Sequence, residues 1–178
     1  DETATEFSVS TPEELAGLSE LVNSGNSMSG ITINLTADLV MNDTSDWNKW
    51  VERGKLPKNV FTPIGKSGNI AGGYYPFCGI FNGNGHTITQ NVNKAYKYTW
   101  DVTGTRPMQS NMFTSANNSL VIVNDLNFAG TMYSITLGHY RSSNQSGFTT
   151  VLNNVNVINT KVASFSGGLS PAMSIYGK

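Results

Sequence analysis

The chain has 178 residues, a net charge of −1 and only 13% charged residues, whose place is taken by 21 Asn, 19 Ser and 18 Thr. This composition is typical of a β-rich extracellular protein of one domain, and it excludes an all-helical bundle, a coiled coil and a strongly charged disordered chain. The 11 Lys and Arg residues are scattered and no apolar run approaches the ~20 residues of a membrane span, so we expect neither nucleic-acid binding nor a transmembrane segment.

One helix is well marked near the start of the chain. Thr11, Pro12 and Glu14 form a capping box, in which Thr is the N-cap, Pro takes the first helical position and Glu the third. The apolar residues that follow recur on one helical face: Leu15, Leu18, Leu21 and Val22. Gly25 can adopt the left-handed conformation that ends a helix, so the pattern predicts a helix over 12–24.

Short strands are expected in the rest of the chain. Residues 31–35 alternate between aliphatic and polar side chains, which predicts a strand with one apolar face. Residues 42–60 and 66–76 interrupt this pattern and are predicted to be loops. Further strands are expected at 39–41, 86–93, 120–129, 132–137, 149–158 and 160–165.

Two segments of the chain repeat each other at an offset of 29 residues. Residues 123–128 and 152–157 both have apolar residues at their first, fourth and sixth places and Asn at their second and fifth. Residues 88–93 are a looser third copy, 35 residues upstream of the first. Repetition on this scale predicts a solenoid, and the uneven offsets suit a parallel β-helix, in which each turn touches only its neighbours.

The Asn residues of the two copies are expected to stack. If each copy belongs to one turn, Asn124 lies near Asn153 and Asn127 near Asn156, at bends where amides hydrogen-bond along the axis. We expect Asn124 and Asn153 to be buried and bonded to backbone groups of the adjacent turns.

The ends of a solenoid need covers. The helix over 12–24 precedes the first predicted strand, so we expect it to cover the first turn. Residues 167–178 carry no signal for a closing strand or helix. We therefore interpret residues 1–178 as one β-helix domain, with an N-terminal segment and capping helix over 1–30 and turns with inserted loops over 31–178. The open C-terminal end suggests a fragment of a longer surface protein, or a partner that covers it.

Four segments, in this order, resemble a known family. They are Leu-Ser-Glu-Leu-Val-Asn-Ser-Gly at 18–25, Ile-Thr-Ile-Asn-Leu-Thr-Ala-Asp-Leu at 31–39, Phe-Thr-Pro-Ile-Gly at 61–65 and Phe-Cys-Gly-Ile-Phe-Asn-Gly-Asn-Gly-His-Thr-Ile at 77–88. The order is similar to the N-terminal cap and first turns of secreted bacterial right-handed parallel β-helix proteins, including those with GLUG-type repeats, although Asn82 stands where Asp is usual. The resemblance covers about residues 7–93.

This resemblance implies an all-β fold, a right-handed parallel β-helix with one N-terminal capping α-helix. It also implies a secreted or bacterial cell-surface setting and often an adhesin or glycan-related role. It does not imply one activity, because the same fold hosts lyases, hydrolases and adhesins.

Few residues offer catalytic or metal chemistry. The motif at 82–86 is predicted to be a tight backbone turn that joins two successive coils of the solenoid, because its Gly and Asn residues suit positive φ angles. His86 and His139 are the only histidines and no Cys-x-x-Cys or His-x-x-x-His spacing occurs, so we expect no metal and no cofactor. Cys78, the single cysteine, is expected to be a small buried core residue. Composition alone leaves a Ser/His/Asp triad open, but no Gly-x-Ser-x-Gly elbow is present.

The carboxylates are spread over different segments. Glycosidic cleavage needs two carboxyl groups about 5–10 Å apart, and the candidates form no Asp-Asp or Asp-x-Asp pair: Asp38, Asp43, Asp46, Asp101 and Asp125. Asp38 suits a turn-capping role. Asp125 stands where the next copy has Asn154, which indicates hydrogen bonding rather than proton transfer. We therefore expect no catalytic residue among them.

Aromatic residues concentrate in three segments that interrupt the repeats, 42–60, 66–76 and 94–106. The candidate ligand-binding residues are Trp47, Trp50, Tyr74, Tyr75, Tyr96, Tyr98 and Trp100. Exposed rings stack on sugars or anchor protein partners. The alternative is that these rings pack their loops onto the solenoid wall.

Together these features favour a non-enzymatic, adhesin-like recognition module that binds a glycan or a host-surface protein through its loop aromatics. Two alternatives remain open. One is a polysaccharide lyase or hydrolase of β-helix fold, and the other is a passive structural stalk of a larger surface protein.

Overall fold

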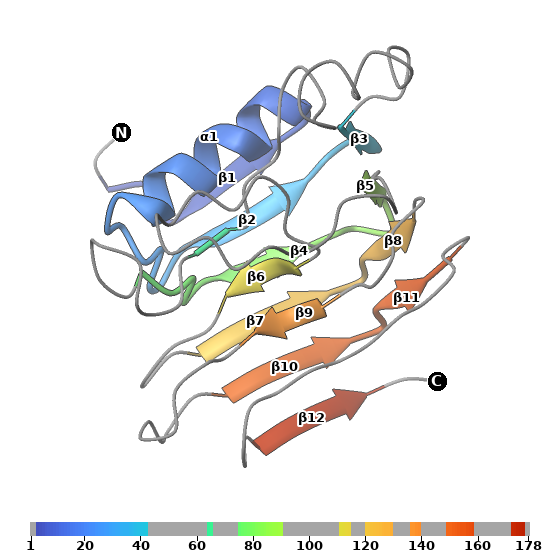
Figure 1. Ribbon diagram of the computed structural model, residues 1–178. Coiled ribbons are helices and arrows are strands. Elements are labelled where there is room, and N and C mark those ends of the chain that lie inside the picture. The colour runs from blue at the N-terminus through green and yellow to red at the C-terminus, as the bar shows by residue number, and fades with distance from the viewer. Residues whose placement is uncertain are drawn as a thin grey trace, which may run out of the picture.

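Six parallel strands form the largest sheet. The computed structural model describes residues 3–42, 64–65, 75–90, 111–114, 120–129, 136–139, 149–158 and 172–176. Within them, sheet A has the strand order β1-β2-β4-β7-β10-β12, and each strand is parallel to its neighbour (Figure 1). The strands are β1 (Glu6–Val9), β2 (Thr32–Leu35), β4 (Ile80–Asn82), β7 (Leu120–Asn124), β10 (Thr149–Asn153) and β12 (Ala172–Tyr176).

Two smaller parallel sheets accompany sheet A. Sheet B has the order β11-β8-β5-β3, sheet C pairs β6 with β9, and Ile64 forms a parallel bridge to Phe113 of β6. Their strands are β3 (Leu39–Met41), β5 (Thr87–Gln90), β6 (Asn111–Thr114), β8 (Asn127–Ala129), β9 (Thr136–His139) and β11 (Asn156–Val157). The chain passes from sheet A to B to C along β4-β5-β6 and again along β7-β8-β9, so the same circuit repeats.

The predicted helix is α1 (Pro12–Asn23), and its capping box is confirmed. Thr11 Oγ1 accepts a hydrogen bond from Glu14 N at 3.2 Å, and the Glu14 carboxylate accepts one from Thr11 N at 3.1 Å. The chain leaves the helix through Gly25, whose φ of 113° lies in the left-handed region. The local signals at both ends of this helix therefore act as predicted.

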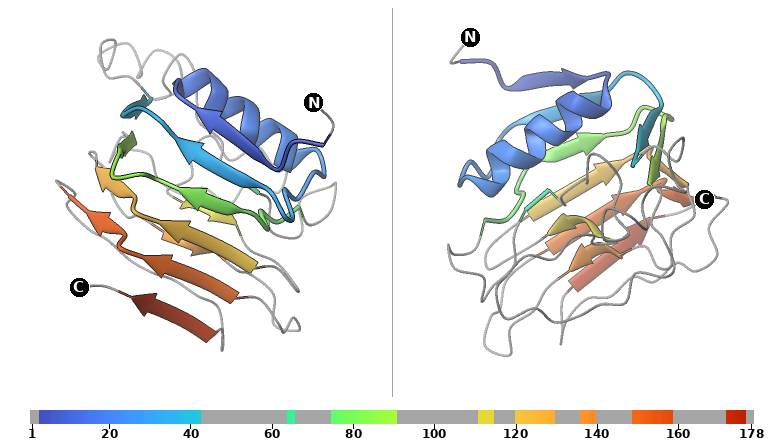
Figure 2. Two further views of the ribbon diagram at one scale, coloured as in Figure 1. Left: turned by 180° about the vertical axis from the view of Figure 1, so that it is seen from behind. Right: turned by 45° about the horizontal axis from the view of Figure 1, so that its top comes forward.

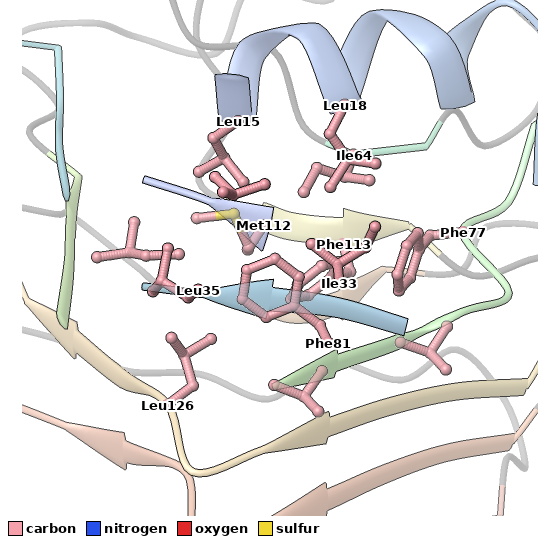
Figure 3. Packing of buried hydrophobic residues seen from close by; sticks show 14 of the residues in the cluster. Leu15, Leu18, Ile33, Leu35, Ile64, Phe77, Phe81, Met112, Phe113 and Leu126 are labelled. Carbon is pink, nitrogen blue, oxygen red and sulfur yellow. The ribbon is translucent and has the colours of Figure 1, made fainter. Parts of the chain in front are cut away.

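The apolar face of α1 joins the hydrophobic core. Figure 3 shows Leu15 and Leu18 pointing from the helix toward Ile64 and Met112, and all four side chains belong to one buried cluster. Leu21, in contrast, is 55% exposed, so its assignment to the buried face is wrong. Six residues after Leu15, Leu21 is turned by roughly 120° from that residue around the helix axis.

Strand β1 lies outside the predicted strands. Residues 6–9 pair in parallel with β2, so α1 connects two neighbouring strands of sheet A (Figure 2, right). The helix thus supplies in the first turn the connection that β5 and β6 supply between β4 and β7. Residues 6–9 alternate between polar and apolar side chains over only four positions, and of the four only Val9 is buried.

The core is built from residues of sheets A, B and C and of α1. Side chains alternate between the two faces of each strand. Four inward-facing residues that pair with one another across adjacent strands are almost fully buried: Ile33, Phe81, Val123 and Leu152. Phe113 of β6 packs against Phe77 and Phe81, with ring centroids 5.3 Å apart in each pair (Figure 3).

Two of the predicted strands are each divided by a bend. The segment 120–129 comprises β7 and β8, and the segment 149–158 comprises β10 and β11. Asp125 and Asn154 occupy the bends with φ angles of 49° and 50°. This left-handed conformation, which Asn and Asp tolerate better than most residues, turns the chain from sheet A to sheet B.

Strands β4, β6 and β12 also lie outside the predicted set. Strand β12 pairs with β10, so the expectation that residues 167–178 carry no strand is wrong. The predicted strand over 160–165 lies outside the described residues, as do 43–60 and 66–74 of the predicted loops. Strands β2, β3 and β5 lie within predicted strand segments, and β9 overlaps another.

The pairing of the strands places the third copy of the repeat at a different position from the predicted one. Val123 pairs with Phe81 rather than with Ile88, and Ile88 pairs with Phe128. The corner at 83–86 is longer than the one at 125–126, so no single sequence offset aligns the strands on both sides of it. The third copy therefore begins at β4, upstream of the predicted position.

Candidate functional site

Most of the candidate aromatic residues lie outside the described residues: Trp47, Trp50, Tyr74, Tyr96, Tyr98 and Trp100. Tyr75 is described and is half-buried. Its ring lies beside Gly25, where an added Cβ would be 3.5 Å from Tyr75 Cε1. This placement is compatible with a ring that packs its segment against the protein, and a binding role for the seven residues stays a prediction.

Four asparagines on neighbouring strands of sheet A form a ladder of side-chain hydrogen bonds. Asn82 Nδ2 donates to Asn34 Oδ1 at 3.0 Å, Asn124 Nδ2 to Asn82 Oδ1 at 2.9 Å, and Asn153 Nδ2 to Asn124 Oδ1 at 2.7 Å. The predicted stacking of Asn124 on Asn153 is confirmed. These amides are half-buried and bond to one another, so the expectation of full burial and backbone partners is wrong.

A second stack follows at the corner between sheets A and B. Asn156 Nδ2 donates to Asn127 Oδ1 at 3.0 Å, as predicted, and Asn127 Nδ2 donates to the carbonyl of Gly85 at 2.7 Å. Beside it, Asn154 Nδ2 donates to Asp125 Oδ1 at 2.8 Å. Asp125 thus serves as a hydrogen-bond acceptor, in line with its exchange for Asn in the next copy.

The motif at 82–86 turns the chain from β4 to β5, so the prediction of a turn is confirmed. The motif joins sheet A to sheet B within one coil of the chain, whereas we expected it to join two successive coils. Asn84, with a φ of 52°, donates from Nδ2 to the carbonyl of Leu35 at 3.0 Å. A Cβ on Gly83 would lie 2.5 Å from backbone atoms of the next corner, so only glycine allows the two corners to approach.

Asp38 and His86 are paired on the exposed side of this corner. His86 Nδ1 lies 3.3 Å from Asp38 Oδ1, and the same oxygen accepts a hydrogen bond from Thr87 N at 2.8 Å. The backbone hydrogen bond, aided by the imidazole, holds the pKa of Asp38 below its ordinary value. Asp38 therefore has a capping role, as predicted, but the group that it caps belongs to the next turn of the chain. Its carboxylate accepts a hydrogen bond from the first residue of β5 and does not cap the bend in which Asp38 itself lies.

A carboxylate that orients an imidazole is also part of a catalytic triad. Over the described ranges, no hydroxyl or thiol is hydrogen-bonded to His86. The contacts of Asp38 and His86 instead join one turn of the chain to the next. The geometry thus supports a structural link more directly than a nucleophile-activating pair.

Stability should fall in acid because of two carboxylates. The pKa of Asp38 and of Glu14 is lower in the folded protein than the ordinary value, so each stabilises the fold above that value and loses this contribution as the pH falls through its folded pKa. We expect Asp38→Asn to show a smaller drop in melting temperature than the wild type between about pH 5 and pH 2 in thermal circular-dichroism scans. Glu13→Gln, an exposed change in the same first helical turn as Glu14, should keep the full drop. An unchanged acid profile in Asp38→Asn would contradict the assignment.

Cys78 is half-buried, so the expectation of a buried core cysteine is wrong. The neighbouring Phe77, in contrast, is fully buried. Burial raises the pKa of the thiol, so the group is protonated at neutral pH and is a poor nucleophile.

Asn82 and Asn124 are the two interior members of the ladder, and Asn82 links β2 to β7. Its amide both donates and accepts, whereas a carboxylate only accepts. We expect Asn82→Asp to cost about 1–3 kcal/mol of unfolding free energy in urea titrations, because a half-buried acceptor then faces Asn34 Oδ1.

Asn34→Asp is the matched control for this change. Asn34 only accepts within the ladder, so a carboxylate can replace its amide at a smaller cost. Equal losses for the two variants, or no loss for Asn82→Asp, would show that the ladder hydrogen bonds do not stabilise the fold.

Two ladder members, Asn34 and Asn82, lie outside the predicted stack. The signal that identifies them is a three-residue pattern of a β-branched residue, an apolar residue and Asn. It occurs on the strands of sheet A at residues 32–34, 80–82, 122–124 and 151–153, and outside them at 40–42 and 157–159. Each of the four copies on sheet A lies within a single strand, whereas the six-residue pattern spans a corner whose length varies.

The part of the chain that the structure describes contains neither a metal-binding cluster nor a membrane-spanning helix. There, no group of three His, Cys, Asp or Glu residues comes together as a metal site would need. Helix α1, like every described segment, lacks the length and apolarity to cross a membrane as a helix.

Known proteins give no further guide to this site. No protein family, curated protein or solved structure matches the chain.

Proposed function

We propose that the chain is a right-handed parallel β-helix that acts as a non-enzymatic, adhesin-like recognition module, secreted or on a bacterial cell surface. The repeated circuit through sheets A, B and C supports the fold, because each turn then contacts only its neighbours. The stacked asparagines support it as well, since they join equivalent positions of successive turns. The proposed ligand is a glycan or a host-surface protein.

The connections between strands are of two kinds that differ in length, and this difference supports the proposal. The corners from sheet A to sheet B are short and stacked: 36–38, 83–86, 125–126 and 154–155. The connections from sheet B back to the next strand of sheet A are long: 42–79, 91–119, 130–148 and 158–171. All seven candidate aromatic residues belong to the first two of these connections. Long connections on a repeated scaffold are where recognition residues usually lie.

A glycan array combined with immobilised host-surface proteins tests this proposal. Wild-type protein should bind a defined subset, and Trp50→Ala or Trp100→Ala should weaken that binding roughly tenfold if the ring is an anchor. Phe7→Ala is the matched control, because Phe7 is an exposed aromatic residue on β1, outside these connections. It should bind like the wild type.

The same experiment separates the two alternatives. Release of new reducing or unsaturated sugar ends from a bound polysaccharide would indicate a hydrolase or a lyase. Failure to bind any glycan or protein on the panel would favour a passive stalk and would contradict the proposed recognition role.

A further inference from the structure

The outer face of sheet A carries two parallel rows of uncharged side chains. Strand alternation that directs Phe81 and Val123 inward directs their neighbours outward. One row is β-branched: Thr32, Ile80, Ile122 and Val151. The second row is the ladder: Asn34, Asn82, Asn124 and Asn153. Adjacent members of each row are separated by one strand spacing, about 4.8 Å.

This outer face is open to the surroundings within the described structure. In Figure 2 (left) the strands of sheet A face the viewer, and no described helix or strand lies in front of them. Both rows are half-buried by their own neighbours, and Leu120 extends the apolar surface with 47% of its area exposed. A regular apolar surface of this kind commonly marks an interaction site.

The ladder leaves hydrogen-bonding capacity unused. Within the row, Asn82 and Asn124 each donate one N–H and accept one hydrogen bond through Oδ1. A carboxamide has two N–H donors and two acceptor lone pairs, so one donor and one acceptor remain on each amide. The row therefore presents alternating donors and acceptors at the spacing of the strands.

The charge of the face defines the ligand further. The two rows contain no ionisable side chain, and Glu6 stands beside them only on the outermost strand, in register with Thr32. A neutral ligand that combines hydroxyl groups with apolar C–H surfaces fits both rows.

We propose that the outer face of sheet A binds an extended, uncharged polysaccharide that lies along the two rows. The C–H faces of its sugar rings pack on Ile80, Ile122 and Val151, and its hydroxyl groups bond to the free amide positions of the ladder. A repeating ligand engages several strands at once, so weak contacts add up. This site is distinct from the loop aromatics and does not depend on them.

Depletion of the full chain from solution by insoluble polysaccharides tests the inference. Cellulose and chitin serve as neutral probes and cross-linked pectate as the anionic probe. We expect the wild type to be retained by at least one neutral probe, and Ile122→Lys and Val151→Lys each to lower that retention roughly tenfold. Val40→Lys is the matched control, because Val40 faces outward on β3 of sheet B with 51% exposure, and it should bind like the wild type.

Thermal scans establish that each variant is folded at the temperature of the assay. Equal retention of wild type and both outer-face variants, or retention by pectate alone, would overturn the inference. So would inhibition of ice growth without retention on any polysaccharide, because the rows would then match a water lattice. Loss in Trp50→Ala and Trp100→Ala with retention in Ile122→Lys would overturn it too, while supporting the separate proposal for the loops.

Discussion

Replacing Phe81 by Ala should lower the unfolding free energy by about 3–5 kcal/mol. Its ring is fully buried, stands in register between Ile33 and Val123, and meets the ring of Phe113 edge-on at a centroid distance of 5.3 Å. Truncation removes these contacts and leaves a cavity. The strands on either side are hydrogen-bonded in fixed register, so the cavity can collapse only in part.

Ile80→Ala on the same strand provides the control for this change. Ile80 is half-buried on the opposite face of sheet A, and its loss should cost about 1 kcal/mol in the same urea titration. Similar losses for the two variants would contradict the assignment of inner and outer faces. That assignment also underlies the two outer rows, so this measurement should precede the polysaccharide experiments.

Local chemistry explains which elements the sequence predicts best. The capping box at Thr11 and the left-handed Gly25 act within one or two turns of helix, so both ends of α1 follow from neighbouring residues. The strand at residues 31–35 is likewise marked by its own alternation. Such signals need no knowledge of the rest of the fold.

Other strands depend on partners that are distant in sequence. Strands β1 and β4 have only four and three residues, so a pattern within either is too short to mark a strand by itself. Their hydrogen bonds come from neighbouring strands, and the pairing of β4 with β7 joins residues some forty positions apart, such as Asn82 and Asn124. Non-local pairing of this kind is invisible to a local periodicity. The handedness and the solenoid architecture stay predictions.

The contacts of the candidate site also divide into those that a sequence pattern predicts and those that no sequence pattern marks. The pairs Asn124–Asn153 and Asn127–Asn156 follow from an exact repeat, because equal corner lengths keep the same offset on both sides. Asn82 does not fit that repeat, because the longer corner at 83–86 changes the sequence offset between equivalent residues. The pairing of Asp38 with His86 has no local signal at all, because it joins two turns at corners of different sequence.

Replacing Leu18 by Ala should cost about 2–5 kcal/mol, measured by urea denaturation. Leu18 is 6% exposed and belongs to the same buried cluster as Ile33 and Phe113, so the helix face helps to form the core at the β1 end of sheet A. Leu21→Ala is the matched control: Leu21 lies on the same helix with 55% exposure, and its loss should cost well under 1 kcal/mol. A cost below about 0.5 kcal/mol for Leu18→Ala would mean that α1 is a surface appendage. A large cost with an unchanged denaturant slope would instead indicate that the helix unfolds together with the sheets, as expected for an element that connects β1 to β2 and covers their inner face.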